Sequence, residues 1–247
     1  MSKILIIAEA GISHGGSIEI VKEMIRQAKS CGADIFKTQL YDVDTLFPDK
    51  QIIAQGKNWY EEVKKTQLTK EQVFELADYC KQLNIEFMAS AFDLERLGWL
   101  EKIGVKRHKI ANRHNKNSIM LNAMRETDKE IIISTYPNDP FVEYEFMCGL
   151  CASNPKYKFL YCISNYPTEL KDLHFSKIKF GERDYDGFSD HTAGIEVSMI
   201  AMARGATIIE KHFCLKRDNS NPDMVCSIEP NELKELVKFA RKVEEVL

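Results

Sequence analysis

Residues 187–213, GFSDHTAGIEVSMIAMARGATIIEKHF, carry the pattern that decides the fold. A short apolar run ends in the polar cluster Ser-Asp-His at 189–191, and a second one ends in Glu-Lys-His at 210–212. The nearly all-apolar stretch 195–203 lies between them and suits the helix that returns the chain. The segment therefore predicts a strand, a helix and a second strand, which is the repeating unit of a parallel sheet.

The same helix-then-strand unit recurs along the chain. It is found in CGADIFKTQ from Cys31, IGVKRHKIAN from Ile103 and RGATIIEKH from Arg204, each with a glycine where a helix would end. We predict strands at 4–8, 35–38, 86–89, 107–110, 130–134, 159–162, 187–189 and 207–211, with helices between them. Eight such units in 247 residues predict a single-domain (β/α)8 TIM barrel over 1–247. An open doubly wound sheet is the alternative.

The composition narrows the class of function. The net charge is −3 and both signs of charge are mixed along the chain, so no basic surface for nucleic acid or for a membrane is expected. The apolar run at 4–8 is too short for a signal-peptide core or a membrane span, and we expect a cytoplasmic protein. The seven cysteines are expected to be reduced thiols rather than disulfides or metal ligands. Small-molecule chemistry is the default.

Polar residues stand at the end of every predicted strand, where a (β/α)8 barrel places its active site. In chain order they are Glu9; Lys37 and Gln39; Ser90; Lys109 and Asn112; Ser134; Ser164; Ser189 and His191; and Glu210 and His212. The polarity of loops is enough to explain the serines and asparagines. It does not explain lysines and a glutamate inside a barrel, because a buried charge needs a partner or a ligand.

The two histidines of the opening segment are predicted to meet. Side chains alternate along a strand, so Ser189 and His191 point the same way on their strand, and Glu210 and His212 point the same way on theirs. If these strands are neighbours, both imidazoles lie over the mouth of the barrel. Two histidines near an acidic residue suit a divalent ion such as Mn or Zn. Hydrogen-bonded histidines in a polar barrel top are the alternative.

Lys37 and Lys109 lie on different strands with hydroxyl and amide donors around them. Together they suit an anion with more than one charge, for example one that carries a phosphate and a carboxylate. The alternative is that both lysines pair with glutamates of the barrel.

Seven segments of the chain together form a recognisable series: IIAEAGISHGGSIE, CGADIFKTQ, FMASAFD, YCISNYPTEL, GFSDHTAGIEV, GATIIEKHF and NPDMVCSIEP. They resemble, in the same order, the catalytic barrel of the sialic acid synthase family. The resemblance implies a transferase that condenses phosphoenolpyruvate with an N-acetylated aldose such as N-acetylmannosamine. The products would be phosphate and a nine-carbon 2-keto-3-deoxy (nonulosonic) acid.

The resemblance also implies roles for individual residues. His191 and His212 would bind a divalent ion, Mn first and Mg, Co or Zn as alternatives, which polarises the sugar aldehyde. Lys37 and Lys109 would hold phosphoenolpyruvate with Ser90, Ser134, Ser164 and Ser189. Gln39, Tyr166 and Asp223 fall where the family contacts the sugar, and Glu9 matches an acidic residue of its first strand.

Two short runs depart from the family pattern. The family has a sequence like Lys-Ile-Gly-Ser-Gly-Glu after the fourth strand, whereas residues 109–114 read KIANRH. Asn112 thus replaces a serine at the substrate, and His114 replaces a glutamate; our hypothesis is that His114 takes over proton transfer. STYP at 134–137 replaces a Ser-Thr-Gly-Met type loop, which puts Tyr136 and Pro137 beside the anion site.

The family also continues into a small antifreeze-like domain that caps the sugar site across a dimer, and the sequence stops before such a domain. We expect that the cap is missing, that a separate polypeptide supplies it, or that the loop 42–58 closes the site. A homodimer is possible on the same resemblance. Two other functions stay open: a non-catalytic barrel that binds phosphoenolpyruvate or sugar, and a synthase for a shorter or phosphorylated aldose, with which Arg113 and His114 would be compatible.

Overall fold

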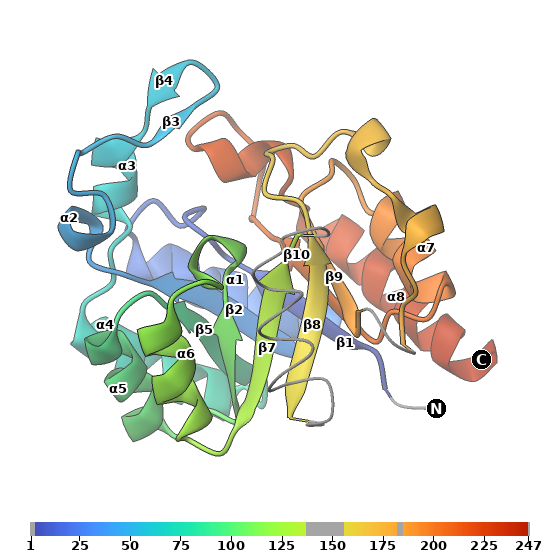
Figure 1. Cartoon of the computed structure of the whole chain (residues 1–247), viewed down its shortest axis with the longest axis horizontal. Helices are drawn as coiled ribbons and strands as arrows, with labels where there is room; N and C mark the ends of the chain where they lie inside the picture. Colours follow the sequence, from blue (N-terminus) through green and yellow to red (C-terminus); the bar gives the residue numbers. More distant parts are fainter. Residues whose placement is uncertain (1–2, 137–155, 182–184, 247) are drawn as a thin grey trace.

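The computed structural model describes residues 3–136, 156–181 and 185–246. Eight parallel strands close into a barrel in which each strand pairs with two neighbours and β10 pairs back with β1 (Figure 1). In barrel order the strands are β1 (Leu5–Glu9), β2 (Ile35–Leu40), β5 (Glu86–Ala91), β6 (Arg107–Ile110), β7 (Glu130–Thr135), β8 (Tyr157–Cys162), β9 (Gly187–Asp190) and β10 (Ile208–His212). The predicted (β/α)8 barrel is confirmed, and the open-sheet alternative is wrong.

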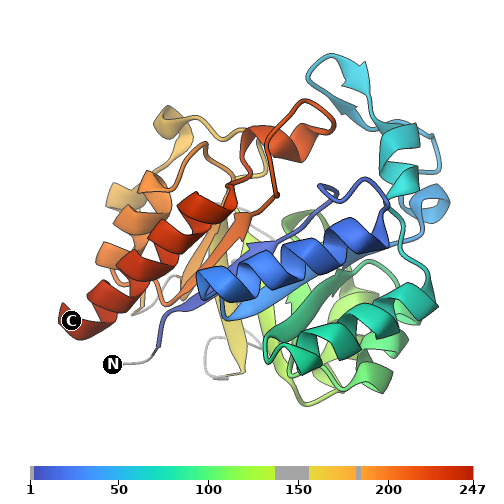
Figure 2. The same cartoon turned by 180° about the vertical axis from the view of Figure 1, so that it is seen from behind.

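Within the described residues, six α-helices surround the barrel: α1 (Ile18–Cys31), α4 (Lys70–Gln82), α5 (Leu94–Ile103), α6 (Ser118–Arg125), α7 (Glu196–Ala203) and α8 (Pro230–Val246). Their ends follow local chemistry. The Ser17 side chain caps α1, which ends at Gly32 with φ +88°, a left-handed conformation that suits glycine. Figure 2 shows α1 and α8 side by side on the outer surface.

The connection from β8 to β9 departs from the regular unit. The described residues between these strands contain two short 3-10 helices, η3 (Leu170–Asp172) and η4 (Phe175–Lys177), and no α-helix. Arg204 fastens this connection to the end of α7, because its guanidinium donates to the carbonyl of Phe175 at 2.7 Å. The barrel wall is therefore covered here by a folded loop.

The barrel interior is built in layers. The apolar layer consists of Ile7, Ile35, Met88, Ile132, Leu160 and Ile208, all fully or almost fully buried. Because strand side chains alternate, the residue two positions further along each strand points into the barrel as well. Those residues are Glu9, Lys37, Ser90, Ser134, Cys162 and Glu210. The barrel thus changes from apolar to polar within one layer.

A separate arm stands over the polar end of the barrel (Figure 1). It follows β2 and comprises α2 (Val43–Leu46), the hairpin β3 (Ile53–Ala54) with β4 (Lys57–Asn58), and α3 (Tyr60–Lys65). The arm has its own apolar cluster around Trp59, which packs on residues of the barrel mouth such as Phe92. The loop at 42–58 is therefore part of a folded element.

Five cysteines, Cys31, Cys80, Cys162, Cys214 and Cys226, are free and buried, whereas Cys148 and Cys151 lie outside the described residues. Within the ranges that the structure describes, no helix is long and apolar enough to cross a membrane.

Candidate active site

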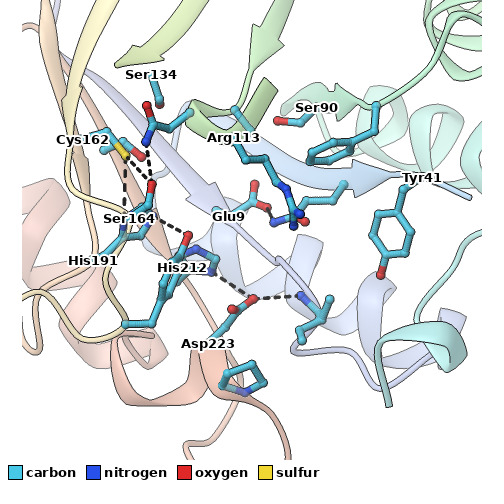
Figure 3. A pocket seen from close by; sticks show the side chains of 18 of the residues that line it. Glu9, Tyr41, Ser90, Arg113, Ser134, Cys162, Ser164, His191, His212 and Asp223 are labelled. Carbon is cyan, nitrogen blue, oxygen red and sulfur yellow. Dashed lines mark hydrogen bonds and ion pairs between the residues drawn. The ribbon is translucent and has the colours of Figure 1, made fainter. Parts of the chain in front are cut away.

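The polar layer opens into a cavity of about 370 Å³ at the C-terminal ends of the strands (Figure 3). The structure brings thirteen of the fourteen sequence-predicted site residues to its lining: Glu9, Lys37, Gln39, Ser90, Lys109, Asn112, Ser134, Ser164, Tyr166, Ser189, His191, His212 and Asp223. Strand register explains the gathering, because Glu9 is level with both Lys37 and His212, and Ser90 is level with Lys109.

Buried lysines and carboxylates form one network at the floor of the cavity. Lys37 makes an ion pair with Glu9, and Glu210 lies 3.5 Å from Lys37 and 3.7 Å from Lys109. The Ser189 hydroxyl donates to the Glu210 carboxylate at 2.9 Å. Both lysines therefore lie within ion-pair distance of barrel glutamates, as one of the two predictions had it, and the anion site stays a prediction. The network contains two carboxylates and two ammonium groups, so its net charge is zero without a bound substrate.

Burial and the neighbouring charges set the ionisation of this network. Burial raises the pKa of Glu210, but Lys109 and Lys37 outweigh it and hold the pKa at about 2. Burial lowers the pKa of Lys37, but Glu210 and Glu9 outweigh it and the net shift is upward. Burial also lowers the pKa of Lys109, which Glu210 offsets only in part, so the net shift is downward. A further anion beside Lys109 would therefore favour its charged form.

Hydroxyl and amide donors line the side of the cavity next to Lys109. The Lys109 ammonium donates to Ser134 Oγ at 2.7 Å, and Asn112 Nδ2 donates to Ser164 Oγ at 2.8 Å. The Ser90 hydroxyl is buried and has no hydrogen-bond partner among the described residues. An unpaired buried hydroxyl is costly, which points to a ligand that completes it.

The two predicted histidines lie together at the opposite side, with ring centroids 5.4 Å apart. His191 Nδ1 lies 2.8 Å from the carbonyl oxygen of Ile163, to which it donates because a carbonyl oxygen can only accept. The Tyr166 hydroxyl lies 3.1 Å from His191 Nε2. On the other ring, His212 Nδ1 lies 3.6 Å from Asp223 Oδ2, as the dashed line in Figure 3 marks.

These residues fit a divalent ion held by two imidazoles. A backbone carbonyl that fixes one ring nitrogen, as Ile163 does for His191, is typical of metal-binding histidines. His212 Nδ1 is buried without a hydrogen bond to any described residue. The described side chains contain no group of three or more His, Cys, Asp or Glu suited to hold a metal. Two imidazoles alone would leave coordination positions open for ligands from outside the chain.

His114 is the one predicted site residue that does not line the cavity. It lies at the end of η1 (Asn112–His114), and its ring packs against Phe92 with centroids 5.1 Å apart. Burial and the charge of Arg113 lower the pKa of His114, so the ring is neutral near pH 7. Of the second departing run, Tyr136 is 42% exposed and Pro137 lies outside the described residues.

The lining also contains residues that the sequence reasoning left out of the site. From the barrel Cys162 is one, and from the arm they include Leu46, Phe47, Ile52 and Ala54. Glu210 and Arg113, which the sequence analysis names, line the cavity as well. The two-residue spacing from the apolar layer identifies Cys162, so a signal for this residue existed in the sequence. The arm residues carry no comparable signal, because apolar residues in a loop show neither a strand nor a helix period.

The cavity lies at the C-terminal ends of the strands, which is where (β/α)8 enzymes have their active sites. The chain belongs to the NeuB family, whose model matches residues 24–247. Members of this family are acid synthases that join phosphoenolpyruvate to a sugar through a new carbon–carbon bond, and this chain is an enzyme of that class.

Individual relatives agree with this classification. The chain is 33% identical to an N,N'-diacetyllegionaminic acid synthase of Legionella pneumophila over 98% of its own length and 72% of the relative. It is 32% identical to an N-acetylneuraminate-9-phosphate synthase of Drosophila melanogaster over 96% and 67%. The crystal structure of an N-acetylneuraminic acid synthetase from Leptospira borgpetersenii with citrate superposes with a TM-score of 0.85 at 30% identity, covering 99% of this chain and 85% of that one.

Proposed function

We propose that this enzyme condenses phosphoenolpyruvate with an N-acetylated, N-acetylmannosamine-like aldose in a divalent-metal-dependent reaction. The products are phosphate and a sialic-acid-like 2-keto-3-deoxy nonulosonic acid. One observation carries the proposal: a buried lysine and serine cluster and a pair of imidazoles with ring centroids 5.4 Å apart share one cavity. The first suits an anion and the second suits an aldehyde oxygen with a metal.

Phosphoenolpyruvate fits the side of the cavity at Lys109. Lys109 with Ser134 and the Asn112–Ser164 pair supply donors for its phosphate and carboxylate. Ser90 has an unused hydroxyl in the same lining. Since Glu210 already balances much of the lysine charge, these neutral donors are needed to hold a multiply charged ligand.

The aldose fits between this cluster and the imidazoles, with its aldehyde at His191 and His212. An ion such as Mn bound there would polarise the aldehyde carbonyl. His191 is held by the Ile163 carbonyl, and Asp223 stands beside His212 and accepts the Ile12 amide at 3.3 Å. Gln39 and Tyr166 add polar groups for sugar hydroxyls.

In the proposed reaction C3 of phosphoenolpyruvate bonds to the aldehyde carbon, a water oxygen adds at C2, and phosphate leaves. Glu9 neutralises Lys37 and accepts Gln39 Nε2 at 3.2 Å, so it positions groups around the reacting atoms. His114 keeps its hypothesised role in proton transfer only if its ring turns from Phe92 into the cavity. His114→Gln then lowers kcat and leaves phosphoenolpyruvate affinity unchanged, whereas an unchanged kcat rejects the role.

The metal part of the proposal has a direct test. His191→Ala and His212→Ala should each abolish Mn binding, measured by electron paramagnetic resonance, and abolish phosphate release. His174→Ala is the matched control, because His174 is exposed on η4's N-terminal flank and does not line the cavity. Wild-type Mn binding in the His191 variant would contradict the assignment.

The rival is a barrel that binds phosphoenolpyruvate or sugar without turnover. Phosphoenolpyruvate binding by calorimetry, together with no product from any aldose in the presence of Mn, would favour this rival. A cytoplasmic location, a homodimer and a separate capping polypeptide belong to the same proposal. Sedimentation of the purified chain tests the dimer.

A further inference from the structure

One wall of the cavity is apolar, and its residues form a group that we call the arm wall: Leu46, Phe47, Ile52 and Ala54. All four come from the arm, and all four are half-buried, because one side packs on the arm's own apolar cluster and the other faces the cavity. The barrel contributes Ile12, Phe92 and Ala111 to the same cluster and the same lining. The wall is therefore a continuous apolar surface that a ligand would cover.

Few polar side chains near the arm wall are available for a hydrogen bond to a ligand. Tyr41 lines it, but its hydroxyl is already bonded to Thr66 Oγ1 at 2.6 Å and to the Val63 carbonyl at 3.2 Å. Arg113 lies over the Phe47 ring with Cζ 4.4 Å from the centroid. No hydrogen bond or ion pair joins Arg113 to another described residue. The Arg113 guanidinium is thus the main donor that a polar substituent would find there.

The arm wall faces the end of the aldose that is remote from the aldehyde. Figure 3 shows Tyr41 on one side of the cavity and the His191–His212 pair on the other. With the aldehyde at the imidazoles, a chain of six carbons extends toward the arm. Its terminal carbon and any acyl group near it then meet apolar side chains.

We propose that the acceptor is an aldose with an apolar remote end, such as a 6-deoxy sugar or one with an N-acyl methyl group at that end. This inference rests on the proposed condensation and names the acceptor class for the same site. A hydroxyl buried against such a wall loses its water without a partner, whereas a methyl group gains from burial. A phosphorylated remote end is the competing acceptor, and it would depend on Arg113.

The test compares three acceptors that differ at one carbon: 6-deoxy-N-acetylmannosamine, N-acetylmannosamine and N-acetylmannosamine 6-phosphate. Each is assayed with phosphoenolpyruvate and Mn for kcat/KM. We expect the 6-deoxy sugar to exceed the 6-hydroxy sugar by about tenfold or more, and the 6-phosphate to be the poorest. Equal values, or preference for the hydroxyl or the phosphate, overturn the inference.

Variants of the arm locate the preference. Ile52→Thr places a hydroxyl in the arm wall and should reduce the deoxy preference severalfold. Ile53→Thr is the matched control, because Ile53 is the next residue, is 65% exposed and does not line the cavity. An Ile52→Thr preference equal to wild type, in a variant that melts like Ile53→Thr, contradicts the proposal.

The outcomes test the proposed condensation and the proposed acceptor class separately. No product from any of the three sugars defeats the proposed function itself. Turnover with the wrong order of acceptors defeats only the inference about the arm wall. If the phosphate is preferred and Arg113→Gln removes that preference, the remote subsite is anionic and the apolar assignment is wrong.

Discussion

Gly11→Ala should disable the imidazole pair without touching either histidine. Gly11 has φ +50°, and a Cβ at this position would lie 2.5 Å from Asp223 Oδ2 and 2.9 Å from His212 Nδ1. Nonbonded heavy atoms prefer about 3.5 Å, so the Asp223 carboxylate or the His212 ring must retreat by about 1 Å. The left-handed backbone adds a separate cost of about 1 kcal/mol for any residue with a Cβ.

Gly15→Ala separates these two effects. Gly15 has a similar φ of +57°, but an added Cβ there has nothing within 4 Å. Both variants should therefore lose about 1 kcal/mol of unfolding free energy from the backbone. Only Gly11→Ala should lose about 1–3 kcal/mol more of unfolding free energy, because it also displaces side chains.

The assays are urea unfolding, Mn affinity and the rate of phosphate release for both variants. A displacement of 1 Å at reacting groups costs about 100-fold in rate, so Gly11→Ala should fall to about 1% of wild type while Gly15→Ala stays active. Mn affinity should fall only in Gly11→Ala. If Gly11→Ala keeps wild-type Mn affinity and rate, the close approach of Gly11 to His212 and Asp223 does not matter for the site.

Three further predictions concern charge and protonation. Ser134→Ala removes the 2.7 Å acceptor of Lys109 and should weaken phosphoenolpyruvate binding about tenfold by calorimetry; an unchanged Kd would contradict the anion site. Glu210→Gln removes the carboxylate that Lys37 and Lys109 share and should lower the unfolding free energy by about 3 kcal/mol at pH 7. A loss below about 1 kcal/mol would show that these ion pairs do not stabilise the fold. Burial lowers the pKa of His14 in the folded protein from 6.5 to about 4. As the pH falls, the unfolded chain therefore takes up this proton before the folded chain does. The free energy of unfolding should fall by about 3 kcal/mol between about pH 6.5 and pH 4. His14→Asn should flatten that part of the pH profile, and a profile with wild-type slope would show that His14 titrates normally.

The strands were predictable because their signal is local. A short apolar run followed by a polar cluster marks most of the eight, whereas 107–110 (RHKI) is predicted from the helix-ending Gly104 before it. The structure extends several strands by one or two residues at the C-terminal end, for example β1 to Glu9 and β10 to His212. Alternation also predicted the direction of the site residues. Ser189 and His191 face the cavity, whereas Asp190 points outward and pairs with Lys211 at 3.2 Å.

Contacts between distant segments were not predictable in the same way. The sequence indicates that Lys37 and Lys109 need partners but does not show that both share Glu210, because that depends on the register of strands far apart in the chain. The arm is a second case, since α2, the β3–β4 hairpin and α3 are short and take their stability from packing around Trp59. His114 is a third case. It directly follows Asn112 and Arg113 in η1, which line the cavity, but its own ring packs against Phe92 instead.

The central claim is tested most directly by the mass of the product. The purified chain is incubated with phosphoenolpyruvate, Mn and N-acetylated aldoses, with a chelator-treated control, and the mixture is analysed for phosphate and by mass spectrometry. We expect phosphate and, in equal amount, a product heavier than the sugar by one pyruvic acid unit, and we expect both to be lost with the chelator. Phosphate without such a product, or a product that forms equally well with the chelator, would contradict the central claim.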